Sequence, residues 1–438
     1  MIPRLSGLLT AAILAIPGAA QAIDIQEVTS PGGIEAWLVE DDSIPFVAID
    51  IWFDGGGSLD PDGARGAVHL MTGLLEEGAG DMDARGFAEA VEGLAAGFEF
   101  DVYRDALTVS ARMLTRNRDE AADLLRAALV EPRFDEDAIE RVRGQVLSMI
   151  EGDARDPDEI ASATFNRMAW GDHPYGSQLE GTRESVSALT RDDIVAAHDA
   201  VLARDRVIVG AAGDITAEEL GLLVDRILGD LPAEGAPLPG MAEYRLDGGT
   251  TVVDFPSPQS VALFGHEGIA RDDPDFFPAF VLNQILGGGG FRSRLMEEVR
   301  VERGLTYGVS SFLGLSEYGQ TVAGRFSSSN DLVAEAIAVI RDQWADVAEN
   351  GVTENELGAA KRYLTGAYPL RFDGNGRIAG ILAGMQADGM PAEYILTRND
   401  RVDAVTLEDV RRVAARLLAP NELHFVVVGQ PEGLEPSN

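Results

Sequence analysis

A long internal repeat is the feature that most constrains the fold of this chain. The run T-R-D-D-I-V-A-A-H-D-A-V-L-A-R-D-R-V-I-V-G-A-A-G-D begins at Thr190, and it aligns without a gap with T-L-E-D-V-R-R-V-A-A-R-L-L-A-P-N-E-L-H-F-V-V-V-G-Q, which begins at Thr406. Each run predicts a Thr-capped helix with acidic residues in its first turn, followed by a strand that ends at Gly213 or Gly429. The repeat is far too long for a solenoid and predicts two copies of one domain.

The segments at the start of the two copies also correspond. Each copy begins with a strand-like run, then a glycine, an Asp-Pro pair and a helical run. These features are residues 46–53, Asp60-Pro61 and residues 68–75 in the first copy, and residues 260–265, Asp273-Pro274 and residues 277–286 in the second. Strands and long helices therefore mix without regular βαβ alternation, which predicts an α+β fold.

Proline and glycine mark the boundary between the copies. Residues 232–240 read P-A-E-G-A-P-L-P-G, a composition that is typical of a linker in which few backbone groups are paired. We therefore expect one domain over residues 23–231 and a second over residues 241–438, joined by the linker at 232–240.

Apolar residues that recur every three or four positions predict further helices. The clearest are at residues 117–130, 136–151 and 331–349. Asn330 is the expected N-cap of the last helix, and Gly351 is expected to end it.

Missing residue types and motifs exclude several kinds of active site. The chain has no cysteine, and therefore no disulfide, no thiolate metal site and no thiol nucleophile. It has no G-x-S-x-G elbow and no Walker or Rossmann glycine pattern. The net charge of −38 repels nucleic acid and anionic lipid, so we expect neither as a partner.

The first 22 residues predict a secretory signal peptide. Arg4 is its positive end, residues 8–16 are a short apolar run, and Ala20-Gln21-Ala22 is a small-x-small cleavage site. The apolar run is too short to span a bilayer. We therefore expect a mature chain that is exported to the periplasm and is free of the membrane.

Residues 66–80 have the outline of a catalytic helix. They read G-A-V-H-L-M-T-G-L-L-E-E-G-A-G, whereas a zinc peptidase of the inverted type needs H-x-x-E-H on such a helix. Counting from His69, the two decisive positions hold Thr72 and Gly73. A threonine cannot take a proton from water near neutral pH, and a glycine has no side chain. The general base and the second metal ligand are therefore missing.

Several strings along the chain carry a resemblance to a known family. They are G-S-L-D-P-D-G-A-R-G-A-V-H-L at 57–70, H-P-Y-G at 173–176, V-G-A-A-G-D at 209–214, and L-N-Q-I-L-G-G-G-G-F-R-S-R-L at 282–295 followed by R-V-E-R-G-L-T-Y at 300–307. In order and spacing the chain resembles the pitrilysin/insulinase family of zinc peptidases over nearly all of its mature length. The resemblance implies two homologous domains around a cavity, each a mainly antiparallel sheet with helices packed on one face.

The resemblance also implies a third zinc ligand further along the first domain. By register with the family's helix, that position falls at Ser148 or Met149, not at Glu151. Glu77 lies about 12 Å along the helix from His69 and cannot share one ion with it. Catalytic zinc takes three protein ligands, so the resemblance implies no metal in this chain. His69 is then a buried or capping residue.

In the second domain the family places an Arg and a Tyr seven residues apart, where they hold the substrate backbone and stabilise the oxyanion. Arg300 and Tyr307 match this pair. The local sequence predicts that Arg300 lies in the last turn of a helix and that Tyr307 begins a strand. Guanidinium and phenol groups are suitable fixed donors for a developing oxyanion. The alternative is an ordinary surface arginine and strand tyrosine.

Some members of this family divide the work between two chains, one with the zinc motif and one with the Arg/Tyr pair. This chain resembles the second kind, a zinc-free subunit that is inactive alone and relies on a homologous partner for zinc. An edge strand at 98–103, including Phe98, Phe100 and Val102, is expected to bind the peptide substrate by strand addition. The alternative function is a non-catalytic peptide-binding or assembly protein with no peptidase partner. The ligand count argues against a zinc enzyme with unorthodox ligands.

Overall fold

The computed structural model describes residues 24–61 and 63–436. The predicted signal peptide, residues 1–22, lies outside the described residues. Within the described ranges, no helix is both long enough and apolar enough to cross a bilayer.

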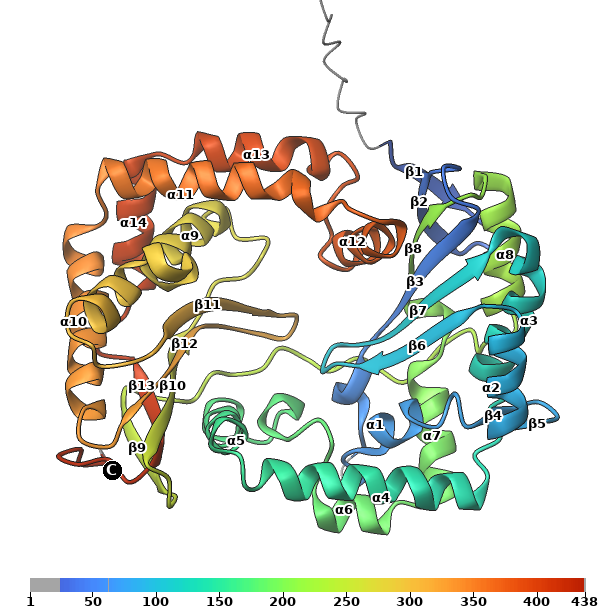
Figure 1. Cartoon of the computed structure of the whole chain (residues 1–438), viewed down its shortest axis with the longest axis horizontal. Helices are drawn as coiled ribbons and strands as arrows, with labels where there is room; N and C mark the ends of the chain where they lie inside the picture. The colour runs from blue at the N-terminus through green and yellow to red at the C-terminus, as the bar shows by residue number, and fades with distance from the viewer. Residues whose placement is uncertain (1–23, 62, 437–438) are drawn as a thin grey trace, which may run out of the picture.

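A six-stranded sheet forms the centre of the first half (Figure 1), in the order β1-β2-β8-β3-β7-β6. Its strands are β1 (Gln26–Thr29), β2 (Glu35–Glu40), β3 (Phe46–Asp54), β6 (Gly97–Val102), β7 (Ala106–Leu114) and β8 (Val207–Gly213). Neighbouring strands are antiparallel except β2 and β8, which are parallel. A separate short pair, β4 (Gly78–Ala79) and β5 (Met82–Asp83), lies beside it.

The second half repeats five of these strands in the same order. Its strands are β9 (Gly249–Asp254), β10 (Gln259–Glu267), β11 (Val309–Ser316), β12 (Gly319–Ser329) and β13 (His424–Gly429). The order β11-β12-β10-β13-β9 contains one parallel pair, β9 and β13. Counted from the parallel pair, β2-β8-β3-β7-β6 corresponds to β9-β13-β10-β12-β11. The predicted α+β fold with two related domains is confirmed.

Except for α5 and α12, the helices of each half pack mainly on one face of its own sheet (Figure 1). In the first half they are α1 (Ala67–Thr72), α2 (Ala84–Gly93), α3 (Arg118–Val130), α4 (Glu136–Asp153), α5 (Pro157–Trp170), α6 (Arg183–Ala188), α7 (Arg191–Val201) and α8 (Ala217–Leu228). In the second half they are α9 (Phe276–Asn283), α10 (Val333–Asn350), α11 (Glu354–Ala367), α12 (Asn375–Ala387), α13 (Tyr394–Ala404) and α14 (Leu407–Leu417). Two large apolar cores result, one in each half.

The repeated sequence run forms the same local structure twice. Thr190 caps α7 and Thr406 caps α14, and each hydroxyl accepts the backbone N–H of the aspartate three residues further on. That aspartate bonds back to the N–H of its threonine, which completes a capping box in both copies. β8 and β13 then follow at matching positions.

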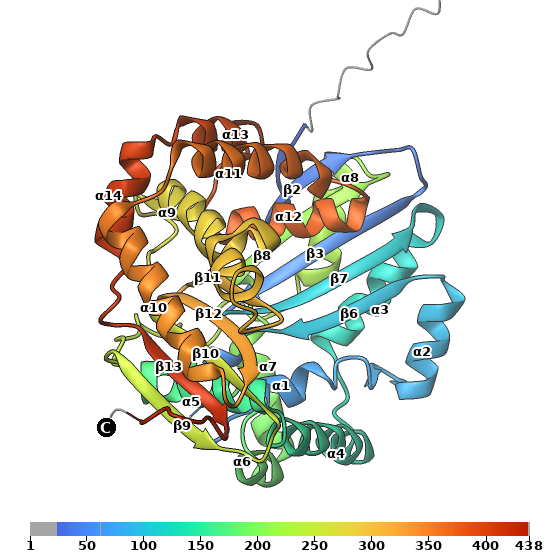
Figure 2. The ribbon, with the colours of Figure 1, turned by 60° about the vertical axis from the view of Figure 1, so that its left-hand side comes forward.

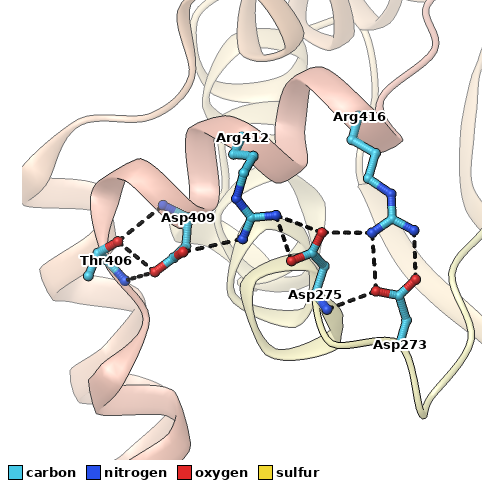
Figure 3. Close-up of polar contacts among 6 residues, drawn as sticks. All are labelled: Asp273, Asp275, Thr406, Asp409, Arg412 and Arg416. Atoms are coloured by element: carbon cyan, nitrogen blue, oxygen red, sulfur yellow. Dashed lines mark hydrogen bonds and ion pairs between the residues drawn. The ribbon is translucent and has the colours of Figure 1, made fainter.

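In the second copy this helix is tied to the Asp-Pro segment by an ion-pair network (Figure 3). In the second half, Arg412 binds both carboxylate oxygens of Asp275 at 2.7 Å. Arg416 joins Asp275 at 2.7 Å and Asp273 at 2.6 Å. The matching positions of α7 hold alanines. The charged anchor of α14 therefore belongs to the second copy alone.

One helix from each half crosses to the opposite sheet. α12 of the second half packs on β3 and β8, and α5 of the first half packs on β10 and β13 (Figures 1 and 2). A Cβ at Gly210 of β8 would lie 2.1 Å from the carbonyl oxygen of Ala379 in α12, so glycine is required for this approach. α5 and α12 are each the third helix after the equivalent strands β7 and β12, so the exchange is reciprocal.

The predicted helices at 117–130 and 136–151 are confirmed as α3 and α4. The helix predicted at 331–349 is α10, and Gly351 ends it with a φ of 71°. The predicted cap is wrong. The Asn330 side chain instead accepts the Ser260 hydroxyl at 2.7 Å and donates to the Ser257 carbonyl at 2.8 Å. It joins the end of β12 to the start of β10 rather than beginning a helix.

Residues 232–240 form neither helix nor strand, yet their backbone is held against the first half. The Ala236 N–H donates to the Ala200 carbonyl at 3.0 Å, and its carbonyl accepts Arg206 Nη2 at 2.6 Å. His173 Nε2 donates to the Gly240 carbonyl at 3.0 Å. These bonds pair part of the linker backbone and tie it to the first half. The domain boundaries themselves stay a prediction.

Candidate functional site

The degenerate helix α1 begins where a buried carboxylate caps it. Asp60 accepts the backbone N–H groups of Gly66 at 2.7 Å and Val68 at 2.8 Å. Gly66 has a φ of 90°, a left-handed conformation that favours glycine. Burial raises the pKa of Asp60 to about 6, although the backbone N–H groups favour its charged form.

Thr72 and Gly73 have structural roles in this helix. Thr72 Oγ1 is buried and donates to the Val68 carbonyl, one turn back, at 2.8 Å. Gly73 directly follows α1, and a Cβ there would lie 3.1 Å from Val142 Cγ1 of α4. Neither position offers a general base or a metal ligand.

His69 is half-buried on the same helix, and its Nδ1 has no hydrogen-bond partner among the described residues. Burial lowers the pKa of His69, and the negative charge of Glu180 opposes this shift. The imidazole is therefore neutral near pH 7.

The residues around α1 do not fit a zinc ion. Ser148 and Met149, the positions expected for the third ligand, are both exposed on α4 and provide no carboxylate. Glu77 forms an ion pair with Arg141. Over residues 24–61 and 63–436, no group of three His, Asp or Glu side chains is placed to hold a metal. No hydrolytic step through zinc follows from this chain's own residues.

In the second half, Arg300 and Tyr307 lie on consecutive short elements. Arg300 is in the last turn of a π-helix, Met296–Val301, and its guanidinium carbon is 4.6 Å from the centre of the Phe291 ring. Tyr307 is 78% exposed. It lies in the turn before β11, which begins at Val309, so it does not itself begin the strand as predicted.

The turn that carries Tyr307 is anchored on both sides. The Thr306 hydroxyl donates to the carbonyls of Ser327 at 2.6 Å and Gly308 at 2.8 Å, and it accepts the Gly308 N–H at 3.0 Å. The Leu305 N–H donates to the Val299 carbonyl at 2.9 Å. The exposed phenol of Tyr307 is therefore carried by a backbone that is hydrogen-bonded on both sides.

A groove of about 330 Å³ borders this turn. Gly308 and Val309 line it from the second half, together with Arg325 of β12, and Asp158 of α5 lines it from the first. The groove thus lies where the crossing helix α5 meets the strand that follows Tyr307.

The predicted peptide-binding segment forms β6, which is an edge strand of the first sheet. Its residues Phe98, Phe100 and Val102 are half-buried, and their side chains pack against the apolar cores. Glu99 and Asp101 alternate with them and are exposed. A peptide could therefore pair with the unpaired backbone groups of β6, but not with these three side chains. β11 is the corresponding edge strand of the second sheet.

The sequence alone assigns no role to two aromatic residues, Phe291 and Tyr175, although both lie in the strings that carry the resemblance. Phe291 follows the glycine run and lies under Arg300, and an aromatic residue directly after four glycines was the available signal. The Tyr175 hydroxyl donates to Asp105 at 2.6 Å and accepts the Tyr318 N–H at 2.9 Å. It joins the tips of the β6–β7 and β11–β12 hairpins, and burial raises its pKa.

Two family models match the chain. One, described as insulinase (peptidase family M16), matches residues 36–183, and the other, described as the peptidase M16 inactive domain, matches residues 188–364. Together they cover more than half of the chain and reach from the first half into the second.

Relatives of full length carry different names. The "Non-peptidase homolog YmxG" of Helicobacter pylori is 26% identical over 93% of this chain and 94% of its own length. The "Uncharacterized zinc protease ML0855" of Mycobacterium leprae is 28% identical over 91% of each chain. Because the names disagree about activity, the residues of this chain must decide it.

A solved structure shows the same fold. The crystal structure of a peptidase M16 inactive domain from Pseudomonas fluorescens has a TM-score of 0.88 and 28% identity, and it covers 95% of this chain and 100% of its own. The two proteins therefore share the fold of both halves and the way the halves are arranged.

Proposed function

We propose, from the premise that this chain belongs to the insulinase family of peptidases (M16), that it is the zinc-free subunit of an exported heterodimeric metallopeptidase. The chain itself is an M16 homologue without the metal-binding residues of a peptidase. A homologous partner with an intact H-x-x-E-H motif would hold the zinc and the general base. Arg300 and Tyr307 of this chain would complete the partner's site.

The observation that carries this proposal is the contrast between the two halves. At α1 the catalytic positions are filled by groups that serve packing, since Thr72 bonds to its own helix and Gly73 abuts α4. In the turn before β11, the Tyr307 side chain is exposed to solvent on a backbone that Thr306 holds in place. The Tyr307 hydroxyl has no hydrogen-bond partner among residues 24–61 and 63–436, and such a donor suits a role toward a bound molecule.

Arg300 complements Tyr307 in such a role. The guanidinium carbon of Arg300 lies 4.6 Å from the centre of the Phe291 ring, and a cation over a ring face keeps its N–H groups free to donate at the edge. Those edges can hold carbonyl groups of an extended peptide, whose backbone would pair with an edge strand such as β6. The strongly negative chain, at −38, favours basic or neutral peptides over acidic ones.

The partner and the compartment are part of the same proposal. The signal sequence supports an exported complex, and the absence of cysteine is compatible with an oxidising periplasm. Peptides are the expected substrate, and zinc is expected in the partner only.

The test is reconstitution with a homologous H-x-x-E-H chain from the same organism. Tyr307→Phe removes one hydroxyl, so turnover of an unstructured peptide should fall roughly 100-fold with little change in KM. Arg300→Ala should raise KM as well, because the guanidinium also holds ground-state carbonyls.

Tyr363→Phe is the matched control, because Tyr363 is 61% exposed on α11 and does not line the groove beside Tyr307. It should leave turnover unchanged. If Tyr307→Phe also supports wild-type turnover, the pair has no catalytic role.

The second candidate is a non-catalytic peptide-binding or assembly protein without a peptidase partner. The relative named a non-peptidase homolog favours it. Peptide binding by the isolated chain, with no gain in hydrolysis when any H-x-x-E-H homologue is added, would select this reading.

A further inference from the structure

A separate pocket of about 270 Å³ lies in the second half between α9, α12, α13 and the turn after α11. Six aromatic residues line it: Phe276, Phe277, Phe280, Tyr368, Phe372 and Tyr394. The pocket does not touch Arg300, Tyr307 or α1, so it is distinct from the site described above.

The charged residues of this pocket are mostly cationic. Arg271, Arg371 and Arg398 line it together with one acid, Asp388. Arg271 Nε pairs with Asp388 at 3.2 Å. In the part of the chain that the structure describes, neither Arg371 nor Arg398 has a carboxylate within ion-pair distance. This excess of positive charge contrasts with the chain as a whole, which has 73 acidic and 35 basic residues.

Arg398 is the most buried of the three arginines, at 6% exposed. Its Nη1 donates to the Leu364 carbonyl at 2.7 Å and to Asn399 Oδ1 at 3.0 Å. Its guanidinium carbon lies 4.6 Å from the centre of the Tyr368 ring and 5.4 Å from that of Phe280. Neutral groups therefore hold a buried cation that lacks a counter-charge, which is costly to maintain. Burial lowers the pKa of Arg398, and the positive charge of Arg371 adds to this effect.

We propose that this pocket binds a carboxylate that is attached to a hydrophobic group. The buried Arg398 and the exposed Arg371 would receive the carboxylate, because a guanidinium fork matches its two oxygens. The aromatic wall would cover the hydrophobic group.

A space of about 270 Å³ is near the lower end of the range of small-molecule pockets. It suits a ligand that presents one carboxylate and one hydrophobic side chain. Two sources fit, the C-terminal residue of a peptide and a free aromatic or aliphatic acid. The proposal does not depend on a peptidase partner.

Calorimetric titration of the full chain tests it. N-acetyl-phenylalanine should bind at least tenfold more tightly than its neutral amide, and acetate alone should bind weakly, because each lacks one half of the recognised group. A tripeptide that ends in phenylalanine with a free carboxylate distinguishes the sources. Binding as tight as that of the acetylated acid indicates a peptide end, and weaker binding indicates a free acid.

One variant should weaken binding of the acid and another should strengthen it. A folding defect could only weaken binding, so the pair separates the two effects. Arg371→Gln should weaken binding about tenfold. Asp388→Asn should strengthen it, because Arg271 loses its competing carboxylate. Arg377→Gln is the matched control, since Arg377 is exposed on α12 and does not line the pocket. Equal binding of acid and amide, no binding at millimolar acid, or an equal effect of Arg377→Gln would overturn the proposal.

Discussion

At the scale of single residues, the former metal positions have acquired packing roles of their own. Thr72 is bonded to Val68, and the site of Gly73 is closed by Val142. Restoring the motif at these positions therefore faces both a steric and a chemical obstacle.

We expect Thr72→Glu combined with Gly73→His to leave the chain without stoichiometric zinc, measured by elemental analysis after dialysis. The double variant supplies a base and a second ligand, but the third-ligand position still holds Ser148 or Met149. It should also melt at a lower temperature, because the new side chains enter a filled space. The comparison is the same variant with Met149→Glu or Ser148→Glu, one of which should bind more zinc. Full zinc occupancy in the double variant would contradict the ligand count.

Asp60, at the start of α1, makes a contribution to the stability of the fold that depends on pH. Its folded pKa of about 6 lies above that of an unfolded aspartate. Folding therefore takes up a proton between the two values, so the stability from this group is complete below the unfolded pKa and is lost as the pH rises through 6.

We expect the free energy of unfolding of the wild type, relative to Asp60→Asn, to fall between pH 4.5 and pH 7 by an amount on the order of 2 to 3 kcal/mol. Denaturant titrations of both proteins at several pH values measure this difference. An independent measurement is the carboxyl titration of Asp60 by NMR, which should have its midpoint near 6. A difference in stability that does not vary with pH would show that Asp60 titrates normally.

At the scale of elements, the repeat allows the same substitution to be tested in two equivalent helices. Thr190→Ala and Thr406→Ala remove the same capping hydroxyl from α7 and α14. Each should lower the free energy of unfolding by about 1 kcal/mol. The two losses should add in the double variant, because the caps lie in different halves of the molecule. Serine at either position keeps the acceptor and is the control. Unequal effects would mean that the neighbouring contacts of the two caps differ in strength.

Such a difference would come from the ion-pair network of Figure 3, which only α14 has. Hydrogen bonds from Arg416 and Arg412 hold the pKa values of Asp273 and Asp275 below their ordinary values. The stability from these pairs is present above the unfolded pKa and is lost as the pH falls through the folded values. Because the arginines are half-exposed, salt should weaken it.

At the scale of the whole molecule, the crossing of α5 and α12 makes each half depend on the other. Trp170 and Phe165 of α5 pack with Val426 and Val428 of the second sheet. α12 closes the inner face of the first sheet, where Gln386 donates to the Val209 carbonyl at 2.9 Å.

We therefore expect the two halves to stay associated after the chain is cut at an engineered protease site within residues 233–239. The nicked protein should elute as one species in size-exclusion chromatography. Gly210→Ala should weaken this association, because a methyl group there meets the backbone of α12. Gly93→Ala, which meets nothing within 4 Å, is the control. Separation of the nicked wild type into two species would mean that the crossing helices contribute little.

The sequence by itself determined the features that depend on residue identity and on local periodicity. The duplicated run, the capped helices and the loss of the metal motif at Thr72 and Gly73 are all readable within a few turns of chain, because caps and ligands act over short spacings. Only the tertiary structure decided the features that depend on distant contacts. It turned Asn330 toward Ser260 instead of a helix end, and it turned the side chain of Phe98 into the core. It also sent α5 and α12 to opposite sheets and gathered three arginines around an aromatic pocket. Helical periodicity shows that a face is apolar but not which surface will cover it, and that choice is made by the packing of the whole chain.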